Sequence, residues 1–253
     1  MKNFSIKLIK FLVLSKAAPS RRDAQKLLIE DRVTVNDQKV HQPSMEVIPD
    51  KDKICVDGKL ITKKPEDFIY IMLNKPENTI CSHADEKGRK TVYELIKRRD
   101  IKNKGLFTAG RLDFKTTGLL FLTNDGYFAQ VLTHPRYEVL KHYIAKIKGE
   151  ITDSILKKMT DGVFIDNERL KFEKVIVIKK TPKRAVLRII LNEGKNREIR
   201  RMFMFFKLTI KSLHRVQIGP FVLPDNLNYG SFKLLKKRQI YDFLNKFEIK
   251  RNH

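Results

Sequence analysis

The sequence predicts an α+β protein in which a small module of helices and strands precedes a larger, strand-rich domain. Three observations support this fold class. Within residues 1–62, helical spacing of apolar residues gives way to short strand-like alternations. Residues 68–245 are dominated by apolar runs and alternations typical of strands, with helical segments between them. A short charged stretch with a proline, residues 63–67 within TKKPED, separates the two parts and predicts a linker.

The charge of the chain indicates a polyanionic partner. Its 253 residues include 53 lysines and arginines against 29 aspartates and glutamates, which gives a formal net charge of +24. Such an excess favours binding to the phosphates of a nucleic acid. The excess is concentrated in residues 179–215, which hold twelve basic and two acidic residues, a local net charge of +10. This segment therefore predicts a basic surface patch that suits a nucleic acid.

The remaining composition favours a cytoplasmic protein without a metal or a cofactor. Cys55 and Cys81 are the only cysteines, and neither they nor the six scattered histidines show the spacing of metal ligands or of a disulfide framework. The apolar run at residues 11–14 is too short for the core of an export signal, which needs ~7–15 residues. No stretch approaches the ~20 apolar residues of a membrane-spanning helix.

Two helices are expected at the start of the small module. Apolar residues at helical spacing predict the first helix over residues 5–15. Ser20, followed three residues later by Asp23, predicts the N-terminal cap of a second helix over residues 21–30. One face of that helix is apolar and the other carries basic residues that are placed to contact phosphate. These basic residues are Arg21, Arg22 and Lys26.

Short strands with tight turns complete the module. Val33 and Val35 alternate with polar residues before an Asn-Asp turn. Residues 53–60 repeat this pattern around the dipeptide Asp57-Gly58. The module is thus expected to be compact, with its strands joined by hairpin turns.

Three segments of the module resemble the S4 RNA-binding domain: KFL at residues 10–12, SRRDAQKLL at 20–28 and RVTVN at 32–36. Asp31 and Asp37 stand where glycine is common in that family. Aspartate tolerates the left-handed backbone better than most residues, so we expect the S4-like fold to be kept. The alternative is a small helical cap on the larger domain that does not bind RNA.

Strands dominate the larger domain, and helices lie between them. The predicted strands, rich in apolar and β-branched residues, are 68–73, 118–124, 141–147, 169–178, 185–191 and part of 208–221. The predicted helices or helical turns are 91–97, 127–132, 152–159 and 196–206. Residues 246–253 are expected to form a frayed basic tail.

One aspartate stands out as a candidate catalytic residue. Asp113 ends the turn Gly110-Arg111-Leu112-Asp113, just ahead of the apolar run at residues 119–122. A loop carboxylate held against a buried strand suits catalysis, because the loop reaches the substrate while the strand fixes the geometry. On these residues alone, a solvated turn aspartate is the alternative.

Four ordered motifs resemble the RsuA/RluB-type pseudouridine synthases. They are NKP at residues 74–76, GRLDxxTxGLLxLTNDG at 110–126, Lys141-x-Tyr143, and EGKNREIRRM at 193–202. The resemblance implies a catalytic domain built on a mixed, mostly antiparallel sheet, which isomerises a specific uridine in ribosomal RNA to pseudouridine. It implies no cofactor and no metal, a monomeric enzyme, and 23S rather than 16S RNA as the target. The partner would be ribosomal RNA or a ribosome assembly intermediate.

The same resemblance implies roles for individual residues. Asp113 is the catalytic residue, and three steps stay open for it: attack at C1′, attack at C6, or removal of a ribose proton. Arg200 pairs with Asp113 and keeps it ionised. Tyr143 stacks on the flipped base, and Ile199 lines the pocket beside it. Arg111 either contacts the RNA backbone or holds the flipped-out conformation. Phosphate contacts are expected from Lys75, Arg197, Arg201 and Arg215, and in the S4-like module from Arg21, Arg22 and Lys26.

Two other functions fit part of the sequence. A non-catalytic, RNA-binding ribosome assembly factor would keep the fold without needing Asp113. A nucleoside or glycoside hydrolase would need a second acid, and Asp125 lies twelve residues after Asp113. The TNDG sequence around Asp125 is, however, typical of a turn.

Overall fold

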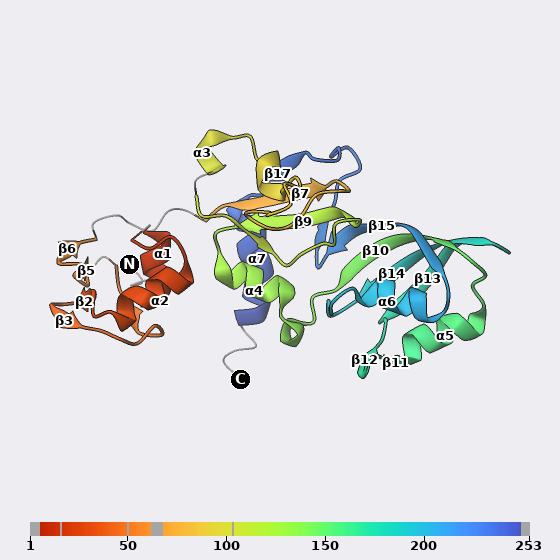
Figure 1. Cartoon of the computed structure of the whole chain (residues 1–253), viewed down its shortest axis with the longest axis horizontal. Coiled ribbons are helices and arrows are strands. Elements are labelled where there is room, and N and C mark those ends of the chain that lie inside the picture. Colours follow the sequence, from red (N-terminus) through yellow and green to blue (C-terminus); the bar gives the residue numbers. More distant parts are fainter. Residues whose placement is uncertain (1–5, 16, 50, 62–67, 103, 249–253) are drawn as a thin grey trace. The chain divides into compact units, whose positions relative to one another are not determined.

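Two compact units make up the chain. The computed structural model describes residues 6–15, 17–49, 51–61, 68–102 and 104–248 (Figure 1). The first unit comprises residues 1–68 with 103–105, and the second comprises residues 69–102 with 106–253. Each unit has a hydrophobic core of its own. The predicted linker, residues 63–67, lies outside the described residues.

The first helix of the first unit is shorter than predicted. α1 is Leu8–Leu14, because Ile6–Lys7 forms a strand, β1. β1 pairs antiparallel with β4 (Glu46–Val47), which the sequence pattern did not predict. The buried Leu8 and Leu12 anchor α1 in the core of this unit.

The second helix begins where its capping residue predicts. α2 is Arg21–Ile29, and the Ser20 hydroxyl accepts a hydrogen bond of 3.2 Å from the backbone N–H of Asp23. Ala24 and Leu28 of α2 are fully buried. The opposite face is exposed and carries the three basic residues Arg21, Arg22 and Lys26.

A four-stranded antiparallel sheet completes the first unit. Its order is β3-β2-β5-β6, with β2 Val33–Val35, β3 Gln38–Lys39, β5 Ile54–Val56 and β6 Lys59–Leu60. The turn residues Asp37 and Asp57 have φ angles of 66° and 52°. Asp31 has a φ angle of 59°, so aspartate takes the left-handed conformation at both positions where the S4 family commonly has glycine.

A nine-stranded mixed sheet forms the centre of the second unit. Seven strands follow the order β13-β14-β10-β15-β9-β7-β17, while β16 pairs with β15 and β8 with β9. Among the described residues, every pairing in this sheet is antiparallel except the parallel pair of β9 and β15. The predicted mixed, mostly antiparallel sheet is therefore confirmed. The strands are β7 (Tyr70–Lys75), β8 (Phe107–Ala109), β9 (Thr117–Thr123), β10 (Lys141–Lys148), β13 (Lys174–Thr181), β14 (Arg184–Leu191), β15 (Thr209–Ile218), β16 (Phe221–Val222) and β17 (Phe232–Leu234).

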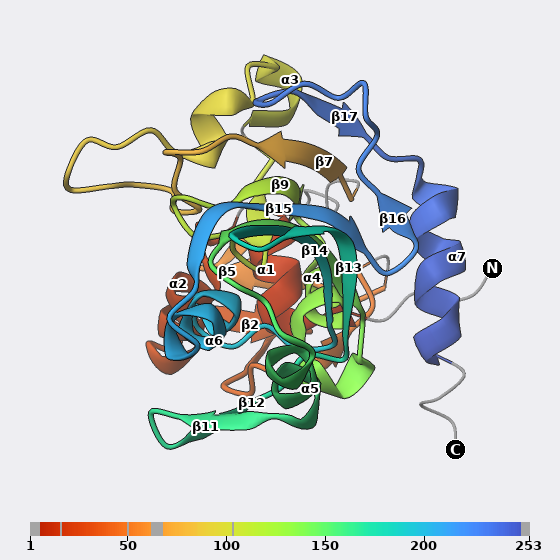
Figure 2. The ribbon, with the colours of Figure 1, turned by 90° about the vertical axis from the view of Figure 1, so that its right-hand side faces the viewer.

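Helices cover one face of this sheet at its β13-β14-β10 end. Figures 1 and 2 both show α5 (Asp153–Asp161) and α6 (Glu198–Phe205) on the same side of these strands. Met159 of α5 and Phe203 of α6 join Leu187 of β14 in the core. The shorter elements are η1 (Val92–Leu95), α3 (Arg99–Lys102), α4 (Gly126–Thr133), η2 (Pro135–Tyr137) and the hairpin of β11 (Val163–Ile165) with β12 (Glu168–Leu170).

The C-terminal residues correct one prediction. α7 is Lys237–Glu248, so residues 246–248 belong to a helix and not to a frayed tail; the rest of the predicted tail lies outside the described residues. Ile240, Phe243 and Leu244 are buried, which is an amphipathic spacing. None of the helices in the described residues is long and apolar enough to cross a lipid bilayer.

Candidate active site

Asp113 lies on a tight turn between β8 and β9. The turn is closed by a hydrogen bond of 3.0 Å from the backbone N–H of Thr116 to the carbonyl oxygen of Asp113. Gly110 opens the turn with a φ angle of 77°, and a Cβ there would lie 3.1 Å from Thr133 Cγ2. Glycine therefore satisfies both the backbone conformation and the close packing at this position.

Lys75 fixes the backbone of this turn through hydrogen bonds. Its side chain is fully buried, and its Nζ donates hydrogen bonds to the carbonyl oxygens of Pro76 at 3.0 Å, Asp113 at 3.2 Å and Thr116 at 2.9 Å. Burial lowers the pKa of Lys75 to about 8. The predicted contact of Lys75 with RNA phosphate is therefore wrong for this conformation, because the ammonium group is enclosed and bonded within the protein.

A glycine brings the Asp113 turn against β15. Gly118 lies opposite Arg215 in the parallel pair of β9 and β15. Its φ angle is 104°, and a Cβ there would lie 2.2 Å from the carbonyl oxygen of Arg215. The two backbones approach so closely that only glycine fits. This contact places the side chains of β15 beside the Asp113 turn.

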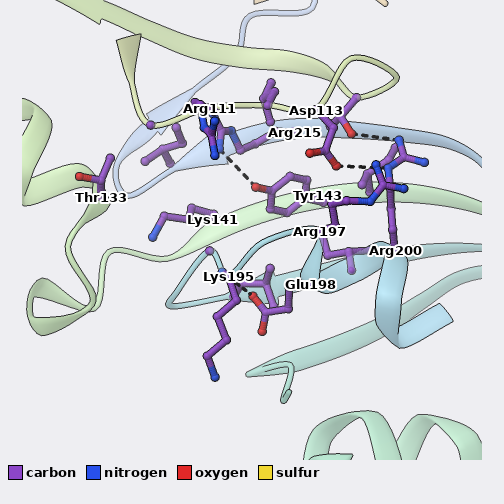
Figure 3. Close-up of a pocket in the computed structure, with 18 of the residues that line it drawn as sticks. Arg111, Asp113, Thr133, Lys141, Tyr143, Lys195, Arg197, Glu198, Arg200 and Arg215 are labelled. Carbon is purple, nitrogen blue, oxygen red and sulfur yellow. Dashed lines mark hydrogen bonds and ion pairs between the residues drawn. The ribbon is translucent and has the colours of Figure 1, made fainter. Parts of the chain in front are cut away.

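The carboxylate of Asp113 forms an ion pair with Arg200 of α6 (Figure 3). Asp113 Oδ2 lies 3.3 Å from Arg200 Nε, although the N–H is not aligned well enough for a hydrogen bond. Arg200 is itself oriented by a hydrogen bond of 3.0 Å from Nη2 to Thr116 Oγ1. The pair expected from the sequence is thus present, and Asp113 remains partly exposed.

Tyr143 and Arg215 form a second, more deeply buried pair. Tyr143 is 8% exposed and Arg215 is 4% exposed. Arg215 donates from Nε to the Leu119 carbonyl oxygen at 2.8 Å and from Nη1 to the Tyr143 hydroxyl at 3.2 Å. Its Nη2 is buried and has no hydrogen-bond partner among the described residues. Arg215 thus lies inside a pocket and not on the open surface, and its contact with an RNA phosphate stays a prediction.

These side chains surround a cavity of about 150 Å³. Ile199, Arg111, Asp113, Tyr143 and Arg200 all line it. Figure 3 shows Asp113, Arg200 and Tyr143 converging on it from a loop, a helix and a strand. A cavity of this size accepts a single six-membered ring. Arg111 is the exposed member of the set.

Two further buried ionisable residues line the pocket, and sequence reasoning did not assign them to the site. Lys141 is 6% exposed, and its Nζ donates to the Asn192 carbonyl oxygen at 3.2 Å. Burial, with the nearby charge of Arg215, lowers the pKa of Lys141 to about 8. Lys141 lies two residues before Tyr143 on β10, so strand periodicity places both on one face, and this signal could have revealed it.

Glu198 is the second unassigned residue. It is 2% exposed, and its Oε2 accepts a hydrogen bond of 3.3 Å from the Lys195 backbone N–H. Its Oε1 is buried and has no hydrogen-bond partner among the described residues. Burial raises the pKa of Glu198 to about 7, and the neighbouring Glu193 adds to this rise. The pocket therefore contains a buried acid in addition to Asp113.

Two of the remaining arginines differ from each other in their surroundings. Arg197 caps α6 in a left-handed conformation, is exposed, and lines the pocket. Arg201 is bound to the β11-β12 hairpin, through Glu168 Oε2 at 2.7 Å, Asp166 Oδ2 at 3.2 Å and the Ile165 carbonyl oxygen at 2.8 Å. Most of the Arg201 donors are thus engaged within the protein, and its contact with an RNA phosphate stays a prediction.

Asp125 has a structural position and does not line the pocket. Its Oδ1 accepts a hydrogen bond of 2.9 Å from the Tyr127 N–H and caps α4, while its Oδ2 accepts one of 2.9 Å from the Tyr70 hydroxyl. It does not serve as the second acid of a hydrolase. The described residues contain no group of three or more histidine, cysteine, aspartate or glutamate side chains that could hold a metal ion.

Comparison with known proteins identifies the family. The RNA pseudouridylate synthase family matches residues 69–204, and the S4 domain matches residues 6–51. An uncharacterized RNA pseudouridine synthase of Mycobacterium leprae is 38% identical over 233 residues, which cover 90% of each chain. Ribosomal large subunit pseudouridine synthase B of Pseudomonas aeruginosa is 32% identical over 228 residues, which cover 87% of this chain but 57% of that protein. A crystal structure of a pseudouridylate synthase superposes with a TM-score of 0.63 at 27% identity, covering 93% of this chain and 98% of the other.

The fold, the pocket and these relatives define an RNA-modifying isomerase with an S4 domain. The chain belongs to the RNA pseudouridine synthase family.

Proposed function

We propose that this enzyme isomerises a specific uridine of large-subunit ribosomal RNA, with Asp113 as its catalytic residue. The observation that carries this proposal is the Asp113–Arg200 ion pair of 3.3 Å at a cavity that Tyr143 also lines. A carboxylate must be ionised to act as a nucleophile or a base, and burial alone would oppose ionisation. The guanidinium of Arg200 supports the charged form and directs it.

The reaction needs little more than one positioned carboxylate and a shaped cavity. The bond between C1′ and N1 breaks, the base turns, a bond between C1′ and C5 forms, C5 loses its proton and N1 gains one. The reaction involves no net oxidation or reduction. Asp113 starts the sequence by attack at C1′, by attack at C6, or by removal of a ribose proton, and each step uses the same carboxylate.

The target uridine has to leave its stack to enter the cavity. Flipping a nucleotide costs a few kcal/mol. Stacking on Tyr143 offsets this cost by ~1–3 kcal/mol. Arg215 orients the tyrosine ring through its hydroxyl, and Ile199 closes the apolar wall. Glu198 and Lys141 supply polar atoms for the edge of the base. The exposed Arg111 and Arg197 contact the phosphates on either side of the flipped nucleotide.

Ribosomal RNA is the proposed substrate because of the S4 domain and the relatives. A relative is named as acting on the ribosomal large subunit, and the chain carries a net charge of +24. We assign the enzyme to the cytoplasm, as a monomer that acts on 23S RNA or on an assembly intermediate. A non-catalytic assembly factor would have no need for the Asp113–Arg200 pair.

The test follows the proton that leaves C5. Transcribed 23S and 16S RNA, tritiated at C5 of uridine, are incubated with the wild-type enzyme and with Asp113→Asn. We expect the wild type to release tritium to water in a stoichiometric amount from 23S RNA alone, and the variant to release none. Release from 16S RNA only would overturn the choice of subunit. Equal release by the variant would show that Asp113 is not the catalytic residue.

A further inference from the structure

A second hollow lies on the sheet away from the active-site pocket. It has a volume of about 620 Å³ and shares no lining residue with that pocket. Five of its lining residues are basic, and none is acidic. They come from four strands or their turns: Lys146 and Lys148 of β10, Lys179 of β13, Arg184 of β14 and Lys211 of β15. We call these five residues the basic groove.

The strand register places four of these cations on one face of the sheet. Lys148 lies opposite Arg184, and Lys146 lies opposite Val186, which lies opposite Lys179. Residues that face each other across neighbouring strands project to the same side, at ~4.8 Å between strands and ~6.8 Å between alternate residues. Ile147 and Ala185, which lie between these cations on their strands, also line the hollow and are buried in the hydrophobic core.

This arrangement costs stability in the free protein. Like charges directly opposite each other on neighbouring strands are destabilising, and Lys148 and Arg184 are such a pair. None of the five basic-groove residues forms an ion pair with an acid among the described residues. The neighbouring Lys180, in contrast, lies 3.9 Å from Asp153. A polyanion bound to the groove would supply the missing negative charge.

We propose that the basic groove binds the sugar-phosphate backbone of the RNA substrate, in a segment outside the one that enters the active site. The proposal rests on the proposed function only in taking RNA as the substrate. Lys146 and Lys148 lie three and five residues beyond Tyr143 on β10, or ~10 Å and ~17 Å along the strand, and on its opposite face. A nucleotide in the pocket does not span this separation. The groove therefore positions a flanking segment and reads no base.

The basic residues of segment 179–215 lie at two different places on the second unit. Arg197, Arg200 and Arg215 line the active-site pocket, whereas Lys179, Arg184 and Lys211 line the basic groove. One basic segment of sequence thus serves two surfaces, because β14, α6 and β15 carry it from one face of the sheet to the other.

The test removes three charges from the groove and three from elsewhere. In the groove variant Lys146, Lys148 and Arg184 become glutamine; in the control variant Lys157, Lys158 and Lys171, all exposed and outside the groove, become glutamine. Affinity for transcribed 23S RNA is measured over a range of salt concentrations. Binding of a uridine tetranucleotide, which is too short to bridge the two sites, is measured in parallel.

We expect the plot of log K against log salt to become less steep by about two in the groove variant, at ~0.7 per lost phosphate contact. Binding of long RNA by this variant at low salt should weaken by about tenfold or more. Its affinity for the tetranucleotide and its melting temperature should not fall, and the control variant should keep the slope. Equal slopes for the two variants would overturn the proposal. If tritium release fails while the groove dependence holds, the proposed reaction is wrong and the groove stands.

Discussion

At the scale of single residues, two cations hold different atoms of the same turn. Arg200 faces the carboxylate of Asp113, and Lys75 binds the carbonyl oxygen of Asp113. The first contact acts on the charge of the Asp113 carboxylate and the second on its position. The family motifs predicted the first contact. They did not predict the second, because residue type reveals the charge of a lysine but not whether it is buried.

Asp113→Asn separates these two effects. The amide is nearly the same size and keeps the backbone contacts of the turn, so folding and RNA affinity should be retained. The missing negative charge should lower the rate of isomerisation by a factor of about 10³ or more. Single-turnover kinetics and RNA titration measure the two quantities. Asp161→Asn, at the exposed end of α5, serves as the control and should keep the full rate.

Glu198 predicts a pH dependence of stability. Its pKa rises from 4.5 to about 7 on folding, mainly through burial. Between these values the folded state binds more protons than the unfolded state, so the free energy of unfolding falls as pH rises through this range. The loss in the free energy of unfolding is complete above pH ~7 and amounts to a few kcal/mol.

Glu198→Gln removes the charge but keeps the shape. We expect its melting temperature to exceed that of the wild type by several degrees at pH 8 and to match it near pH 4.5. Thermal denaturation at both values measures the difference. Exposed Glu150→Gln should show no such dependence. A gain that is the same at both pH values would mean that Glu198 is ionised to the same extent in both states.

At the scale of elements, capping signals and long apolar runs were enough to locate the main helices and strands. Ser20 and Thr152 begin α2 and α5 as predicted. The two- and three-residue strands β16 and β17 were missed, because strands that short are defined by their partners rather than by their own sequence. The contacts of Arg201 with Asp166 and Glu168 were missed for a related reason: these partners on the β11-β12 hairpin are distant in sequence.

The parallel contact of β9 with β15 is sensitive to one methyl group. Gly118→Ala would place a Cβ 2.2 Å from the Arg215 carbonyl oxygen at a φ angle of 104°. Strain and overpacking together should cost on the order of 3–5 kcal/mol. Chemical denaturation measures the loss, and tritium release should fall with it. Gly126→Ala is the matched control, because a Cβ there meets no atom within 4 Å; its stability should not fall.

At the scale of the whole molecule, the sequence predicted two parts with different tasks. The S4-like unit has its own core and presents an exposed basic helix face, while the second unit contains the pocket. The order of the motifs along the chain was sufficient for this division. The basic groove was not predictable, since it depends on how four strands lie beside one another in the sheet.

The charge on α2 should contribute to affinity without affecting the chemical step. In the double variant Arg21→Gln with Arg22→Gln, the plot of log K for RNA binding against log salt should become less steep by about 1–2. The single-turnover rate at saturating RNA should stay unchanged. Lys51→Gln with Lys59→Gln removes the same charge from exposed positions outside α2. If both double variants have the same slope, α2 is not the RNA-binding face of this unit.

The contact of Gly118 with Arg215 also sets an order of events during synthesis on the ribosome. Arg215 reaches Gly118 only after nearly all of the chain has been made, whereas the first unit requires nothing beyond residue 105. At ~5–20 residues per second, the intervening chain takes on the order of ten seconds to appear. Throughout that interval the residues of the first unit are already available to fold, but the strand that completes the pocket has not yet been translated.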